Sequence, residues 1–229
     1  MERSRAVASK RLSRREPPNR FERNRFSTVI YLFCEGKTES EYLKELSSGS
    51  GFRIVTRGEE ASPASLIESA VDFLLDADIA KDFKANPNNE VWIVFDDDEK
   101  PEVPIAMKAF SAALRRIKKA GLGSQIRVGF MKPCIELWAV MCLPEGLRAF
   151  GKAKGHRKME SLLRRLMPTY RHDGNPYFDI SKMTEWREAC KRARDWERQW
   201  GPFPDCASAT WYAGIHELVA RIQNAKGLS

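Results

Sequence analysis

Two apolar, β-rich runs that end directly in acidic residues constrain the fold of this chain more than any other feature. Residues 27–34 (STVIYLFC) precede Glu35, and Val91–Phe95 (VWIVF) precede Asp96. Continuous apolar runs of this length are typical of parallel strands that are buried on both faces of a sheet. The chain is therefore expected to place acidic side chains where buried parallel strands end.

Strand and helix patterns alternate as far as about residue 145. Further strands are predicted at 52–56 and 125–130, and helices at 37–46, 62–75 and 104–120. Such alternation with short connections predicts an α/β fold with right-handed crossovers. We expect a Rossmann-like, mostly parallel, four-stranded sheet flanked by helices over residues 26–145.

The rest of the chain has a different pattern. No strand signal follows residue 145, and helices are predicted at 158–166, 182–200 and 207–224. Residues 146–229 are therefore expected to form a helical C-terminal section that packs on the core.

The first 25 residues carry most of the net charge. They contain nine Arg or Lys and three Glu, so they contribute +6 of the total +8. Because they hold few apolar side chains, residues 1–25 are predicted to be a disordered basic tail. Two interpretations stay open: a solvated leader, or an arm that binds the phosphates of nucleic acid through Arg11, Arg14 and Arg15.

Several classes of protein are disfavoured by the sequence. No apolar stretch approaches the ~20 residues of a membrane span, and no secretory signal is visible. The five cysteines form no CxxC pair, and the three histidines show no zinc-binding spacing. These features predict a cytoplasmic protein with reduced thiols and no membrane contact.

Acidic residues follow three of the four predicted strands. Glu35 and Glu39 follow the first strand, Asp96 and Asp98 the third, and Glu136 the fourth. Ligands of open parallel sheets bind beyond the carboxyl ends of the strands, and clustered carboxylates suit Mg²⁺ or Mn²⁺. The alternative is that these acids only stabilise helix starts or lie solvated in loops.

Three motifs carry a resemblance to a known family. They are Cys-Glu-Gly-Lys-Thr-Glu at 34–39, the strand that ends in Asp-Asp-Asp-Glu at 96–99, and Lys-Pro-Cys-Ile-Glu-Leu-Trp at 132–138. Together they closely resemble the RloB-like TOPRIM proteins, and more distantly the nuclease half of OLD-family proteins. The likeness runs from about Val29 to the C-terminus and implies a TOPRIM-like core.

The resemblance also implies roles for particular residues. Glu35 would act in acid–base chemistry or on a metal, and the metal ligands would be Glu39, Asp96 and Asp98. Glu136 would be a further catalytic acid, and Lys182 the best candidate for a lysine that stabilises the phosphate. The family usually has Asn where this chain has Lys132, and Arg or Lys where it has Asp97.

Candidate contacts to nucleic acid lie beside these motifs. Lys37 and Lys132 belong to the first and third motifs, and Lys154 and Arg157 belong to the basic, glycine-containing segment 151–158. That segment lacks the spacing of a P-loop, so nucleotide binding of that type is not expected. A solvated linker remains the alternative for it.

The implied function is a divalent-metal-dependent endonuclease that hydrolyses RNA, with tRNA as one candidate, or DNA. Such proteins resemble effectors of bacterial anti-phage defence by abortive infection, acting beside an ABC-type or AAA-type ATPase. Two alternatives stay open. The chain could be a non-catalytic subunit that binds nucleic acid or the ATPase through a degenerate site, or a primase-type enzyme that forms phosphate esters. The oligomeric state is not predicted.

Overall fold

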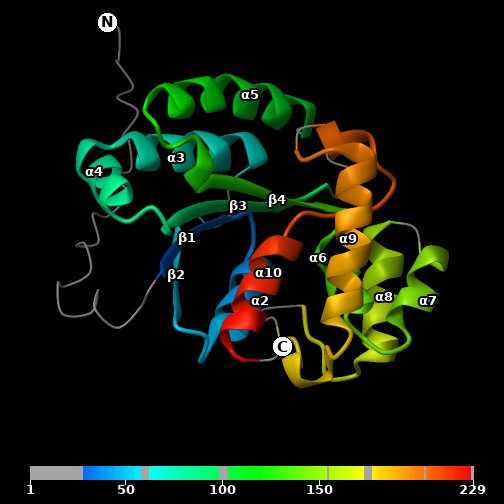
Figure 1. Cartoon of the computed structure of the whole chain (residues 1–229). Coiled ribbons are helices and arrows are strands. Elements are labelled where there is room, and N and C mark those ends of the chain that lie inside the picture. The colour runs from blue at the N-terminus through cyan, green and yellow to red at the C-terminus, as the bar shows by residue number, and fades with distance from the viewer. Residues whose placement is uncertain are drawn as a thin grey trace, which may run out of the picture.

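A computed structural model describes residues 28–57, 62–97, 103–153, 155–172, 177–203 and 205–227. The strands are β1 (Thr28–Cys34), β2 (Phe52–Arg57), β3 (Glu90–Asp96), β4 (Ile126–Lys132) and β5 (Tyr212–Ala213). The helices are α2 (Lys37–Ser47), α3 (Pro63–Leu75), α4 (Ala77–Ala85), α5 (Val103–Lys119), α6 (Ile135–Met141), α7 (Gly146–Ala149), α8 (His156–Leu166), α9 (Trp186–Trp200) and α10 (His216–Ala225). Figure 1 shows their arrangement around a single sheet.

The five strands lie in the order β2-β1-β3-β4-β5. The first three pairings are parallel, and β5 pairs antiparallel with β4. The predicted mostly parallel sheet flanked by helices is therefore confirmed, with one strand more than the four predicted. The extra strand, Tyr212–Ala213, has only two residues and so offers no periodicity that sequence reasoning could detect.

Helices cover both faces of the sheet. On one face lie α3 and α5, while α2 and α10 lie side by side on the other (Figure 1). The apolar runs of β1 and β3 have their explanation here: all seven residues of β3 are buried, because both of its faces are covered.

The order of the strands also creates a switch point in the sheet. From β1 the chain passes through α2 to β2 on one side, whereas β3 and β4 lie on the other side of β1. Helices that follow the two neighbouring strands β1 and β3 consequently lie on opposite faces. A crevice beyond the carboxyl ends of such strands is where open α/β sheets bind their ligands.

The C-terminal section is attached to the sheet through β5 as well as through helices. Helix α8 agrees closely with the predicted 158–166, but α9 begins at Trp186, four residues later than predicted. The predicted helix at 207–224 starts too early, since α10 begins only at His216. The reason is Gly214, whose backbone N–H donates to Phe130 O at 2.8 Å and whose Cα leaves no room for a Cβ against β4.

One buried hydrogen bond joins the helices that follow β1 and β4. Trp138 Nε1 of α6 donates to the Tyr42 hydroxyl of α2 over 2.7 Å. Trp138 is fully buried and Tyr42 is 2% exposed. The bond therefore holds α2 and α6 together near the ends of the strands they follow.

Within the described part of the chain, no helix is long and apolar enough to cross a membrane. The predicted basic tail, with Arg11, Arg14 and Arg15, lies outside the described residues. The same holds for Asp98 and Lys154.

Candidate active site

Two of the predicted acids lie side by side at the switch point. Glu35 directly follows β1, and its backbone N–H donates to Val94 O of β3 over 3.3 Å. Asp96 is the last residue of β3 and pairs in register with Met131 of β4. The carboxyl ends of the two neighbouring strands thus deliver a Glu and an Asp to one rim, as the sequence predicts.

Glu39 joins this rim from the first turn of α2. Its side chain is only 5% exposed. It folds back over Gly36, because a Cβ built on Gly36 would lie 3.0 Å from Glu39 Oε2. The glycine of the Glu-Gly-Lys-Thr-Glu motif is thus explained by close approach: it leaves space for the Glu39 carboxylate beside the end of β1.

Asp96 is fixed in place by the start of α6. It is 7% exposed, and its Oδ2 accepts a hydrogen bond of 3.2 Å from the backbone N–H of Ile135. This contact links the end of β3 to the Pro-Cys-Ile-Glu motif, so two motifs far apart in the sequence lie side by side.

A lysine also lies at this rim. Lys132 ends β4, and its Nζ is 3.5 Å from Asp97 Oδ2. A backbone hydrogen bond joins the same two strand ends, since the N–H of Asp97 donates to Met131 O over 2.9 Å. The two positions at which this chain departs from the related pattern, Asp97 and Lys132, are therefore partners of each other.

We refer to Glu35, Glu39, Asp96 and Asp97 together as the acidic rim. Their arrangement differs from that of a buried carboxylate at the opposite end of β3. There, Glu90 accepts a hydrogen bond from Trp92 Nε1 at 2.8 Å and pairs with the guanidinium groups of Arg127 and Arg221. That set is typical of a structural carboxylate, whereas several carboxylates gathered on one rim repel one another and favour a bound cation.

The fifth predicted acid, Glu136, has a group of partners of its own. It is 1% exposed, and its Oε1 accepts a hydrogen bond from the Tyr170 hydroxyl at 2.6 Å. His172 Nδ1 lies 3.3 Å from Oε1, and His156 Nε2 lies 3.7 Å from Oε2. Two histidines that are scattered in the sequence thus meet one buried carboxylate.

These contacts determine the protonation of the group. Burial alone would raise the pKa of Glu136, but the neighbouring His156, His172 and Tyr170 outweigh burial and hold that pKa well below its usual range. The hydrogen bond to Glu136 raises the pKa of His172 above its ordinary value. Burial, followed by the charge of Glu136, raises the pKa of Tyr170. Glu136 is therefore an anion at neutral pH.

The other cationic side chains that the sequence analysis singled out lie at different distances along the chain from the acidic rim. Lys37 is exposed at the start of α2, beside the acidic rim, and Arg157 is exposed in the first turn of α8. Lys182 ends a short 3-10 helix and pairs locally with Asp179 at 3.5 Å. The described contacts of Lys182 do not connect it to the acidic rim, and its role on the phosphate stays a prediction.

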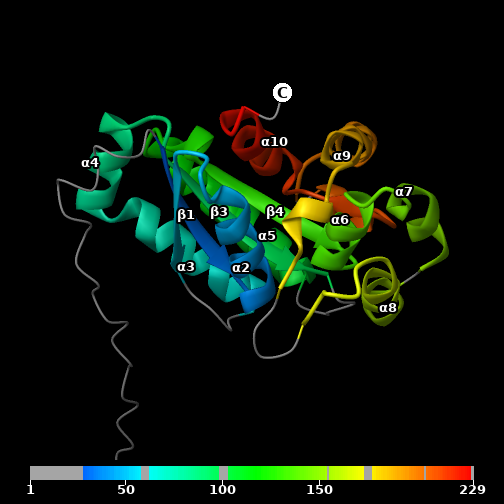
Figure 2. The ribbon, with the colours of Figure 1, turned by 90° about the horizontal axis from the view of Figure 1, so that it is seen from below.

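A basic groove of about 820 Å³ lies along α7 and α8. Four cationic side chains line it among the described residues, namely Arg148, Lys152, Lys158 and Arg165. Because α8 packs on α6, this groove belongs to the same end of the molecule as α6 (Figure 2). A groove of this charge can accommodate the phosphates of a nucleic acid.

Sequence reasoning missed Tyr170, His172, His156 and Cys134 as neighbours of Glu136. The histidines are 16 residues apart with no metal-binding spacing, and only tertiary packing brings them together. Cys134 and Glu136 lie within the third motif, which was the one available signal.

The comparison with known proteins agrees with the motifs. No curated protein matches the chain. The model of a family described as RloB-like protein matches residues 30–222, a span that contains Glu35, Glu39, Asp96 and Glu136. The chain therefore belongs to the RloB-like protein family.

Proposed function

We propose that this chain is a divalent-metal-dependent nuclease with a TOPRIM-type centre at the acidic rim. One observation carries the proposal: β1 and β3 are neighbours in a parallel sheet, and Glu35, Glu39 and Asp96 lie at or just after the ends of these two strands, at the switch point. This is where the topology of such a sheet leaves room for a ligand.

The residues present fit Mg²⁺ or Mn²⁺. Both ions prefer oxygen ligands, and the rim offers carboxylates held by rigid elements. Glu39 and Asp96 would hold the ion, with Asp98 as a further predicted ligand. The Glu39 carboxylate lies close over Gly36, where a Cβ would come within 3.0 Å of its Oε2. When bound, the ion would neutralise the negative charge that develops on the phosphate during hydrolysis.

The chain's own residues then provide the remaining steps. Glu35, half-buried at the end of β1, accepts a proton from the attacking water. The water oxygen forms a bond to phosphorus, the P–O bond to the leaving oxygen breaks, and that oxygen takes up a proton from solvent. Lys132 and Lys37 attract the phosphate to the rim, while the N–H of Ile135 keeps the Asp96 carboxylate in one orientation.

The basic groove supports a polyanionic substrate. Its four cations lie on the helical segments that follow α6, and α8 packs against α6, whose first turn follows β4. Both RNA, including tRNA, and DNA carry the phosphates that these cations would bind. A cleavage experiment that offers both nucleic acids shows which of them is the substrate.

The wider role that we propose is that of an effector in bacterial anti-phage defence, acting with an ABC-type or AAA-type ATPase. Its support is the family resemblance that the three motifs carry. A gene for such an ATPase beside the gene for this chain is the expected finding in a genome that encodes it.

A second candidate is a subunit that binds nucleic acid or the ATPase without cleaving. The Lys132–Asp97 ion pair favours it, because an ammonium group already neutralises part of the rim. The two functions differ in what Asp96 does: a binding subunit keeps its function when this carboxylate is lost.

Cleavage of labelled total tRNA and of plasmid DNA with Mg²⁺ or Mn²⁺ tests the proposal. Asp96→Asn is the informative variant, because an amide oxygen can still accept the Ile135 N–H while the negative charge is removed. Asp72→Asn, whose side chain is 75% exposed on α3, is the matched control. Products that require metal, persist in the control and disappear in Asp96→Asn support the nuclease. Nucleic-acid binding without cleavage in all three proteins, with the ATPase present, supports the binding subunit.

A further inference from the structure

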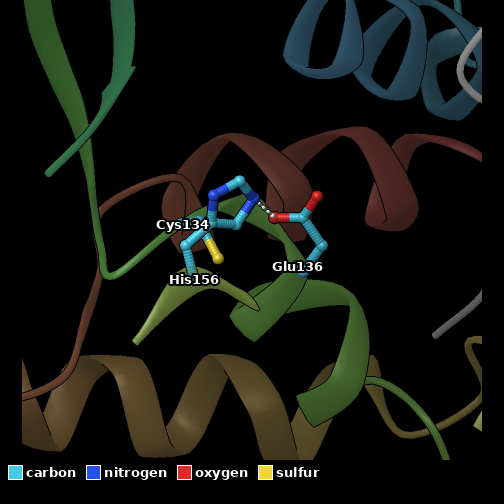
Figure 3. Close-up of side chains that lie close together, drawn as sticks. All are labelled: Cys134, Glu136 and His156. Atoms are coloured by element: carbon cyan, nitrogen blue, oxygen red, sulfur yellow. Dashed lines mark ion pairs between the residues drawn. The ribbon is translucent and has the colours of Figure 1, made fainter. Parts of the chain in front are cut away.

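A second group of potential metal ligands lies on the segments that follow β4. Cys134, Glu136 and His156 each offer one ligand atom, and these atoms all lie within 4.8 Å of one another. Figure 3 shows the three side chains close together, with the ion pair between the His156 imidazole and the Glu136 carboxylate as a dashed line. The three side chains come from the segment after β4, the first turn of α6 and the first residue of α8.

The two oxygens of Glu136 have different surroundings. Oε1 is occupied by the Tyr170 hydroxyl at 2.6 Å and His172 Nδ1 at 3.3 Å. Oε2 is buried and has no hydrogen-bond partner among the described residues, and it faces His156 Nε2 at 3.7 Å. The carboxylate is therefore oriented through one oxygen, and the other faces His156.

One pair of these atoms has nearly the spacing that a tetrahedral ion requires. For Zn²⁺ bonds of ~2.0 to 2.3 Å to nitrogen, oxygen and sulfur, neighbouring ligand atoms are about 3.4 to 3.6 Å apart. The separation of 3.7 Å between Glu136 Oε2 and His156 Nε2 is already near this value. A side-chain shift of a few tenths of an ångström would complete the geometry for this pair.

Burial and donor type also favour a metal. Cys134 is fully buried and Glu136 is 1% exposed, while the side chain of His156 is 32% exposed and leaves a path from solvent. One sulfur, one nitrogen and one oxygen donor suit Zn²⁺, whereas the oxygen-only acidic rim suits Mg²⁺ or Mn²⁺. Three protein ligands leave a fourth position for water.

We propose that Cys134, Glu136 and His156 bind a Zn²⁺ ion, and that Tyr170 and His172 orient Glu136 for it. Hydrogen-bonding partners of this kind fix the direction of a ligand and raise the affinity of the site. The site is chemically distinct from the acidic rim and does not depend on nuclease activity. It assigns Glu136 to zinc rather than to the acidic rim.

Titration of the chelator-treated full chain with Co²⁺, a spectroscopic substitute for Zn²⁺, tests this site. The wild-type protein is expected to show a thiolate-to-cobalt charge-transfer band in the near ultraviolet that one equivalent of Zn²⁺ removes. Cys134→Ser should lose the band. Cys142→Ser should keep it, because Cys142 is an equally buried cysteine at the other end of α6. Asp96→Asn should also keep it, which separates this site from the acidic rim.

A second pair of variants keeps the test valid if Cys134→Ser fails to fold, as judged by circular dichroism. His156→Gln, at a half-exposed side chain, should abolish or greatly weaken Co²⁺ binding. Tyr170→Phe should weaken it about 10- to 100-fold, as expected for loss of a group that orients a ligand. A wild-type protein without the charge-transfer band, or a band that persists in both Cys134→Ser and His156→Gln, overturns the assignment. The group would then be a hydrogen-bonded cluster alone.

Discussion

Removal of the Tyr42 hydroxyl tests how α2 and α6 are held together. In the wild-type protein the Tyr42 hydroxyl accepts the indole N–H of Trp138 over 2.7 Å, and Tyr42→Phe removes this acceptor. Because Trp138 is 0% and Tyr42 only 2% exposed, water cannot replace the hydroxyl without rearrangement. A buried donor left unpaired costs about 1 to 3 kcal/mol. For a chain of this length, that corresponds to a fall in melting temperature of roughly 2 to 12 °C.

Urea denaturation of both proteins measures this free energy. We expect a lower free energy of unfolding for Tyr42→Phe with an unchanged m-value, since the surface exposed on unfolding is the same. Tyr177→Phe is the matched control, because Tyr177 is 47% exposed, and its effect should stay within about 0.5 kcal/mol. A Tyr42→Phe protein as stable as that control would refute the reasoning, since the Trp138 N–H would then not depend on this partner.

Three further predictions concern the rim, the groove and the thiols. Gly36→Ala should push the Glu39 carboxylate aside and weaken Mn²⁺ binding about tenfold in a titration; unchanged binding would contradict the role given to this glycine. Arg148→Glu together with Lys158→Glu should weaken RNA binding and reduce the slope of log affinity against log salt, by about 1 for each phosphate that the groove no longer neutralises. An unchanged slope would exclude the groove as the binding surface. Burial raises the pKa of Cys190 to about 11 and of Cys206 to about 12, so neither thiol should react with Ellman's reagent at pH 8 until the protein is unfolded. Rapid reaction of either thiol in the native protein would contradict their burial.

Much of the sheet could be predicted because both faces of its central strands are covered. The uninterrupted apolar runs of β1 and β3 are a direct result of that coverage, and they mark the strand ends where Glu35 and Asp96 lie. The position of Glu39 could also be predicted, since the first turn after β1 must return to the same rim. At these positions the apolar sequence pattern and the tertiary structure have the same cause, which is burial of both faces of the strands.

Other features could not be predicted because they depend on contacts between distant segments. The short strand β5 is specified by pairing with β4 rather than by any pattern of its own. His156 and His172 meet Glu136 only through the packing of α6 against α8 and the loop after it. The ion pair of Lys132 and Asp97 likewise joins residues on neighbouring strand ends that are 35 positions apart.

Direct binding of Mn²⁺ to the full chain is the measurement that tests the central claim most closely. Loss of the electron paramagnetic resonance signal of the free ion reports binding without any assumption about substrate or partner. We expect wild type and Asp72→Asn to bind Mn²⁺ equally, and Asp96→Asn to bind it at least tenfold more weakly while it keeps a native circular dichroism spectrum. Equal binding by Asp96→Asn and wild type, or no binding by the wild type at millimolar Mn²⁺, would contradict a metal centre at the acidic rim.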